Sequence, residues 1–347
     1  MKKSFTILEL IIVIVILGVL GTISIEILQK TFQNYLKNKT LNYLSLKTDL
    51  TLNKIAAKMH NRIKNSVIAV KCDTDDETSA DYCLNYNNKS FIPISNLDPT
   101  SPINYPVVEW LYVSRFSKRG MWNSDSKSVK PGWSGFVDLK QTQQSANDEY
   151  TIITPDSNFT VVSDIDSEWL KQWGVVGYDD VFANKLDTLL FSGSDGRGDL
   201  DTVANSYGYY DNTATRVFQI TPQNDETLKV KALTTSNSTT VYESYYVVRG
   251  AMAIVPVYNK STNDYNLTLF FNYFPWNASN SSQRKSADGN SAHQMYLEGN
   301  RELLATHVTQ FKFKEEGDLL RIYLCITSPD VKLSDYNLTI CKEKVVF

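Results

Sequence analysis

Apolar residues dominate the first thirty positions of the chain. The run from Phe5 to Leu28 covers 24 residues, which as a helix reach roughly 36 Å against a hydrocarbon core of about 30 Å. Segment 5–28 is therefore predicted to span a membrane. Lys2 and Lys3 precede it and favour a cytoplasmic N-terminus, with the chain beyond residue 30 outside. A cleaved secretory signal peptide is the competing interpretation. The length of the run and the lack of a small-residue cleavage site at its far end disfavour it.

The helical pattern continues beyond this span. Residues 26–65 contain neither Pro nor Gly, and apolar residues recur mostly three or four positions apart, as on one face of a helix. The pattern predicts an amphipathic helix over 29–65 that continues from the membrane span. The predicted apolar stripe consists of Leu28, Phe32, Leu36, Tyr43, Leu46, Leu50, Ile55, Met59 and Ile63.

Strand patterns dominate from Pro106 onward. Two pairs of candidate strands predict hairpins, one with Gly317 in its turn and one closed by the polar residues 259–264. The expected fold class is α+β, with a long N-terminal helix packed on a mainly antiparallel β-sheet head, residues 66–347. Short helices are expected at 164–173 and 295–305, and long loops at 117–150 and 276–292. The candidate strands are 106–116, 186–192, 215–220, 227–234, 241–257, 265–274, 307–314, 319–327 and 338–346.

The net charge of -3 combines two opposite regions. Residues 27–71 carry nine Lys or Arg against Asp49, a charge of +8, whereas residues 72–347 carry 24 basic and 35 acidic residues, a charge of -11. An acidic body argues against nucleic acid as a direct partner, because phosphate binding needs a basic face. The basic stretch either lies over anionic headgroups or is the solvated face of a helix. A hydrophobic content of 42% with 12% aromatic residues excludes a disordered chain.

Glu9 is the unusual residue of the apolar run. A carboxylate inside a membrane helix costs about 2.5–3.5 kcal/mol on insertion scales, so it is expected to have a partner or a function. Two interpretations remain open on these grounds. Glu9 is either a functional carboxylate, or one that is protonated or reaches the cytoplasmic headgroups close by.

Residues 2–21, KKSFTILELIIVIVILGVLG, resemble the class III leader of type IV pilins and pseudopilins. The resemblance implies that a prepilin peptidase removes leader 1–4 by cutting between Ser4 and Phe5, and methylates the new amine of Phe5. Ser4 stands where the family usually has Gly. Glu9 falls where the family places its Glu, fifth from the cut. By this resemblance Glu9 neutralises the Phe5 amine of an adjacent subunit, in a low-dielectric setting where an unpaired charge is costly.

The same resemblance implies a function in assembly. The expected protein is a minor pilin-like subunit, a pseudopilin of a type II secretion or DNA-uptake (competence) machine, and its large head fits a filament tip or an initiation complex. Leu303–Thr327 is also similar to the C-terminal hairpin of the large J-type minor pseudopilins. Expected partners are other pilin-like subunits, bound through the N-terminal helix, and an inner-membrane assembly platform. The expected location is one pass through the inner membrane, with the head periplasmic or in an extracellular filament.

Two alternative functions remain, a type IV pilus tip adhesin and a membrane-tethered exported enzyme. The three histidines, His60, His293 and His307, lie in unrelated contexts, and no H-E-x-x-H, G-x-S-x-G or Gly-rich phosphate loop occurs. The chain is therefore not expected to be an enzyme, although two carboxylates from distant positions can still meet in a fold.

Four cysteines lie outside the membrane segment: Cys72, Cys83, Cys325 and Cys341. An even count in an exported region predicts disulfides. Three connectivities are possible, and the local pairs Cys72–Cys83 and Cys325–Cys341 close the shortest loops. The absence of any C-x-x-C sequence argues against a zinc or redox site.

Two further surface features are candidate sites. Asp195, Asp199 and Asp201 lie among glycines and could wrap Ca²⁺, with an acidic surface turn as the alternative. Some pseudopilins bind calcium in their heads, so the resemblance supports that ion; no other cofactor is expected. Three N-x-Thr sequons have Asp two positions earlier, which resembles the acceptor of bacterial oligosaccharyltransferases. Their asparagines are Asn158, Asn266 and Asn337.

Overall fold

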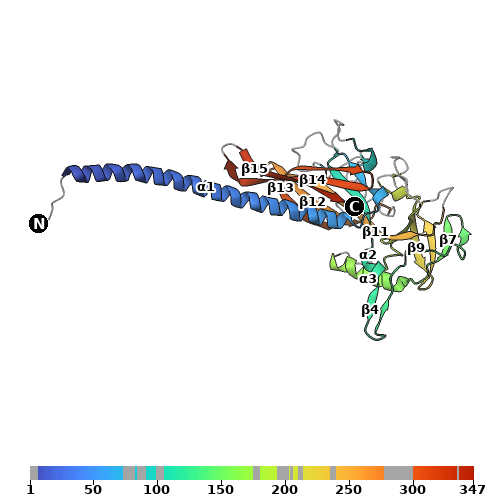
Figure 1. Ribbon diagram of the computed structural model, residues 1–347. Coiled ribbons are helices and arrows are strands. Elements are labelled where there is room, and N and C mark those ends of the chain that lie inside the picture. Colours follow the sequence, from blue (N-terminus) through green and yellow to red (C-terminus); the bar gives the residue numbers. More distant parts are fainter. Residues whose placement is uncertain are drawn as a thin grey trace.

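The computed structural model describes residues 7–72, 83, 91–98, 105–174, 180–193, 203, 206–209, 214–234, 240–276, 300–333 and 336–347. The expected α+β class is confirmed: one long helix precedes a large antiparallel β-sheet head (Figure 1). The helices are α1 (Ile7–Met59), α2 (Arg115–Arg119) and α3 (Phe159–Gln172), with 3₁₀ turns η1 (Lys64–Ser66) and η2 (Ile94–Asn96). The strands are β1 (Ile68–Val70), β2 (Phe91–Pro93), β3 (Val107–Val113), β4 (Met121–Asn123), β5 (Ser128–Lys130), β6 (Gln143–Ala146), β7 (Glu149–Ile153), β8 (Thr188–Phe191), β9 (Val217–Pro222), β10 (Thr227–Ala232), β11 (Tyr245–Asn259), β12 (Asp264–Tyr273), β13 (Asn300–Glu316), β14 (Leu319–Leu333) and β15 (Tyr336–Val346).

Helix α1 runs for 53 residues, and its N-terminal part projects away from the head (Figure 1). Its C-terminal part packs on the face of the sheet formed by β12–β15 and β3. Each fully buried Leu, Ile or Met side chain stabilises this contact by about 1.5–3 kcal/mol. The C-terminal part of the helix is therefore firmly attached to the sheet. The buried residues are Leu44, Thr48, Thr51, Leu52, Ile55 and Met59.

The predicted apolar stripe of this helix is partly wrong. Five members of that stripe are exposed: Leu28, Phe32, Tyr43, Leu46 and Leu50. Four residues that it does not include are buried instead: Leu44, Thr48, Thr51 and Leu52. Thr48 donates its hydroxyl to the carbonyl of Leu44 at 2.7 Å, so it is buried with its polar group satisfied. The helix also ends at Met59 and not at residue 65, because the following residues pair with β3.

Thirteen strands form one sheet, with the main order β15-β14-β13-β12-β11-β8-β9-β10-β7-β6. Strand β11 links two lobes. Its first residues, Tyr245–Val248, pair with β8, and the remainder pairs with β12. The sheet lobe comprises α1, β1–β3 and β12–β15 with most of β11. The distal lobe comprises α2, α3 and β4–β10 with the start of β11, and it lies beyond the C-terminal end of α1 (Figure 1).

The nine predicted strands all overlap observed strands, and both predicted hairpins form, with Gly317 at φ +63° in the β13–β14 turn. Two regions differ. The predicted loop 117–150 contains β4, β5, β6 and the start of β7. The helix predicted at 295–305 is wrong over its described residues, because 300–305 belong to β13 and pair with β12.

Helix α3 starts earlier than the predicted 164–173. The side chain of Asn158 accepts a hydrogen bond from the backbone N–H of Val161 at 3.0 Å, which caps the helix immediately before Phe159. The apolar side of α3 then packs against β7–β10 in the core of the distal lobe.

Candidate functional sites: the projecting helix and a basic cleft

The first candidate site is the N-terminal part of α1. Among the described residues, this helix has one segment long and apolar enough to cross a membrane, with a mean hydropathy of 2.8 over 18 residues that are 0% buried. Glu9 lies in the first turn of α1 and is exposed. Ser4 and Phe5, the residues of the expected cleavage and methylation, lie outside the described residues.

A second apolar surface runs along α1 beside the head. Its members, Phe32, Tyr43, Leu46 and Leu50, are 59%, 62%, 59% and 59% exposed. Positions 43, 46 and 50 are three and four residues apart, so they lie on one face of the helix. We call these four residues the exposed stripe. The face of α1 opposite Tyr43, Leu46 and Leu50 is buried on the sheet, whereas residues 31–35 are exposed all round. The exposed stripe is therefore available to a partner outside the monomer.

The basic stretch 27–71 contacts the acidic head. Lys54 lies 2.5 Å from a carboxylate oxygen of Glu302 on β13, and Lys342 on β15 pairs with Asp49 of α1. Lys47 donates to the hydroxyl of Thr306 at 2.9 Å. The contact of Lys54 with Glu302 therefore follows the charge contrast seen in the sequence, whereas the pair of Lys342 with Asp49 has the opposite polarity.

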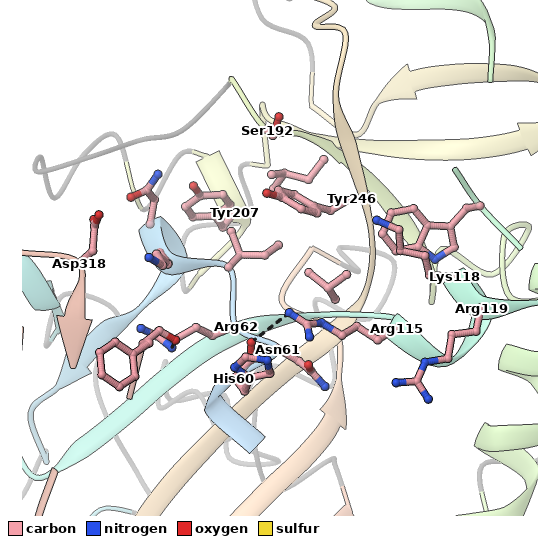
Figure 2. Close-up of a pocket in the computed structure, with 17 residues that line it drawn as sticks. His60, Asn61, Arg62, Arg115, Lys118, Arg119, Ser192, Tyr207, Tyr246 and Asp318 are labelled. Atoms are coloured by element: carbon pink, nitrogen blue, oxygen red, sulfur yellow. Dashed lines mark hydrogen bonds between the residues drawn. The ribbon is translucent and has the colours of Figure 1, made fainter. Parts of the chain in front are cut away.

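A cleft of about 760 Å³ opens where the end of α1, α2 and the start of β11 meet (Figure 2). It lies at the junction of the two lobes, a common place for binding sites. Five of the described lining residues are Lys or Arg and one is Asp. They are Arg62, Lys64, Arg115, Lys118, Arg119 and Asp318, beside His60, Asn61, Ile63, Asn65, Val113, Trp133, Leu190, Ser192, Tyr207, Tyr246 and Phe347.

The cations of the cleft are held in different ways. Arg62 donates to the carbonyl of Met59 at 3.0 Å, and Arg115 donates to that of His60 at 3.4 Å, so both contact the C-terminal end of α1. Burial lowers the pKa of Arg62, and the nearby charge of Glu315 partly opposes this effect. The ammonium of Lys118 lies 4.7 Å from the ring centre of Trp133, a cation–π contact.

A buried charge cluster lies between the lobes. Arg249 of β11 contacts Asp166 of α3 and lies 3.8 Å from Asp187, which precedes β8; these side chains are 2%, 0% and 0% exposed. Ser114 donates to both carboxylate oxygens of Asp166. Burial lowers the pKa of Arg249 to about 10 and raises the pKa of Asp187 well above its usual value. The guanidinium lies closer to Asp166 than to Asp187, so Asp166 is its main partner.

The cysteines form the two local disulfides. Cys72 is bonded to Cys83, and Cys325 on β14 is bonded to Cys341 on β15, where the two residues are direct cross-strand partners. Of the three possible connectivities, the structure has the one that closes the shortest loops.

The remaining sequence candidates are dispersed. Asp195, Asp199 and Asp201 lie outside the described residues, and the described part of the chain contains no group of three or more metal-ligating side chains. Asn158 is engaged as the cap of α3, and its amide donates to Asp225 at 3.0 Å. Asn266 lies within β12 and Asn337 lies exposed on β15.

Sequence reasoning missed the basic cleft. Its cations come from two segments, 62–64 and 115–119, and the overall acidity of residues 72–347 concealed the second one. The available signal was the sequence Arg115-Phe-Ser-Lys-Arg119, three basic residues on one helical turn of an otherwise acidic head.

Comparisons of the chain with protein-family models, with curated proteins and with solved structures find no match.

Proposed function

We propose that this chain is a minor pilin-like subunit that assembles through α1 into a type II secretion or DNA-uptake pseudopilus. One observation carries the proposal: a single helix of 53 residues has an exposed apolar half that projects from a β-rich head to which its other half is fixed. This geometry suits a subunit that is drawn out of a membrane by its neighbours. The resemblance of residues 2–21 to the class III prepilin leader supports the same function.

The mechanism assigned to α1 is docking between subunits. After a prepilin peptidase cuts between Ser4 and Phe5 and methylates the new amine, that cation pairs with Glu9 of a neighbouring subunit. Within apolar surroundings, such a pair is favoured over two separate charges. The exposed stripe on α1 then packs against neighbouring helices, since its Tyr and Leu side chains gain free energy on leaving water.

The position proposed for the subunit is the filament tip or the initiation complex. The distal lobe lies beyond the C-terminal end of α1 (Figure 1). A subunit stacked above this one along the helix direction would meet that lobe, whereas a subunit added below meets the free part of α1. The proposed location is therefore one pass through the inner membrane before assembly, with the head on the outer side.

Substituting Glu9→Gln tests the docking mechanism, and Glu26→Gln on the same helix is the matched control. Glu26 is exposed and pairs with Lys30 at 2.7 Å one turn away, so its replacement also removes one carboxylate from α1. Both variants are expected to insert in the membrane at wild-type levels. The Glu9→Gln protein is expected to be absent from the sheared filament fraction, whereas the Glu26→Gln protein is expected to be present in it. Equal incorporation of the two variants would contradict the proposed role of Glu9.

A further inference from the structure

The basic cleft gathers cations from both parts of the chain. Arg62 and Lys64 come from the basic stretch 27–71, and Arg115, Lys118 and Arg119 come from residues 72–347, whose net charge is -11; among the described lining residues, Asp318 is the one carboxylate side chain. Bringing like charges together is unfavourable unless an anion or a carboxylate neutralises them. Two carboxylates lie near these cations: Asp318 lines the cleft, and the charge of Glu315 acts on Arg62.

Capping of α1 accounts for only part of this cluster. Arg62 and Arg115 each donate to one carbonyl at the end of the helix, and Arg62 also donates to the main-chain oxygens of Phe347 at 3.2 Å and Val346 at 3.5 Å. Each guanidinium has five N–H donors, so both retain donors beyond these contacts. Lys64 and Arg119 do not contribute to the cap. Arg115, Lys118 and Arg119 are three and four positions apart on α2, so their side chains lie on one face of that helix.

Two tyrosines line the opposite side of the cleft, of which Tyr207 is 0% exposed. Figure 2 shows Tyr207 and Tyr246 across the cleft from the guanidinium of Arg115. Tyr246 is 37% exposed and so presents ring surface to the cavity. A ring surface opposite several cations suits a ligand that has both an anionic group and a ring.

We propose that this cleft binds a small organic phosphate with two or more negative charges, its phosphates near α2 and its ring on Tyr246. Guanidinium groups match phosphate oxygens in a bidentate geometry. A volume of about 760 Å³ falls in the range of small-molecule sites. A long polyanion fits less well, because residues 72–347 carry a net charge of -11 and would repel it. This inference does not depend on filament assembly.

Isothermal titration calorimetry of the purified full chain in detergent, at constant ionic strength, tests the ligand class. The probes are ADP, fructose 1,6-bisphosphate, pyrophosphate, citrate and adenosine. We expect ADP or fructose 1,6-bisphosphate to bind more tightly than pyrophosphate, and citrate and adenosine to bind weakly. Whichever of ADP and fructose 1,6-bisphosphate binds more tightly identifies the kind of ring that the ligand carries. Binding of citrate as tight as that of the phosphates would overturn the proposal, as would the absence of phosphate binding.

Paired variants locate the site. Lys64→Gln/Arg119→Gln removes two exposed cations of the cleft, and Lys140→Gln/Lys260→Gln removes two exposed lysines that do not line it. The net charge change is the same. We expect the first pair to weaken phosphate binding by about tenfold or more, since charge-assisted contacts are lost, and the control pair to bind as the wild type does. Equal weakening by both pairs would assign the binding to general electrostatic attraction and overturn the cleft as the site.

Discussion

Substituting Arg249→Met tests how the two lobes are joined. The guanidinium of Arg249 neutralises Asp166, and both side chains are almost fully removed from solvent. Methionine has a similar length but no charge, so the variant leaves the carboxylate of Asp166 buried with only the hydroxyl of Ser114 as a described donor. Removing one partner of a buried ion pair costs about 3–5 kcal/mol. This is a large part of the roughly 5–15 kcal/mol that stabilises a typical domain.

Urea unfolding of the full chain in a mild detergent measures the loss, with tryptophan fluorescence as the signal. Trp169 lies 5.7 Å from the guanidinium, so its emission reports on this junction. We expect the midpoint to fall by about 1 M or more, given slopes of about 1–3 kcal/mol/M in urea. The double variant Arg249→Met/Asp166→Leu is expected to recover part of the loss, because no unpaired charge then remains. A midpoint of Arg249→Met within about 0.3 M of wild type would refute the reasoning.

Substituting Asp187→Asn tests the pH dependence of stability that the same buried charge cluster predicts. Burial raises the pKa of Asp187 in the folded chain, so the folded state holds this proton to higher pH than the unfolded state does. The stability that depends on the proton is complete below the unfolded pKa of about 3.9 and is lost as the pH rises through the folded pKa. Asparagine needs no proton. We therefore expect the variant to lose less stability than wild type as the pH rises above the unfolded pKa, and a steeper loss would contradict the raised pKa of Asp187.

Three further predictions concern other parts of the chain. Gly250→Ala should destabilise the head by about 1–3 kcal/mol, because Gly250 has φ +127° and an added Cβ would lie 2.8 Å from the carbonyl of Tyr273; an unchanged urea midpoint would contradict this. Reducing the disulfide between Cys325 and Cys341, whose sequence separation is 16, should cost about 3 kcal/mol by the loop-entropy estimate, as measured by unfolding of Cys341→Ser with and without reductant, in which the variant should resemble reduced wild type. Leu46→Asp in the exposed stripe should leave the urea midpoint unchanged, since Leu46 is 59% exposed, but should reduce recovery in sheared filaments; undiminished recovery would separate the stripe from assembly.

The sequence was most informative where one physical effect dominates. The apolar run 5–28 exceeds the thickness of a bilayer, and the hairpin around Gly317 combines strand patterns with a residue that accepts positive φ. Local cysteine pairing also followed from loop length. These features depend on residues close together in the chain.

The predictions from sequence were wrong or incomplete where contacts between residues far apart in the chain determine the structure. The buried face of α1 includes Thr48 and Thr51, which a hydrophobic pattern passes over because their hydroxyls are satisfied only after the helix forms. Residues 300–305 carry helix-compatible side chains, yet pairing with β12 makes them a strand. The basic cleft unites residues 62–64 with 115–119, whose proximity depends on the pairing of β3 with the chain after α1.

N-terminal mass spectrometry of the protein from cells with and without prepilin peptidase tests the proposed function most directly. We expect a mature chain that begins with N-methyl-Phe5 when the peptidase is present, and an uncut leader through Ser4 when it is absent. The same unprocessed N-terminus under both conditions would contradict the pilin pathway and would leave α1 as a plain membrane anchor.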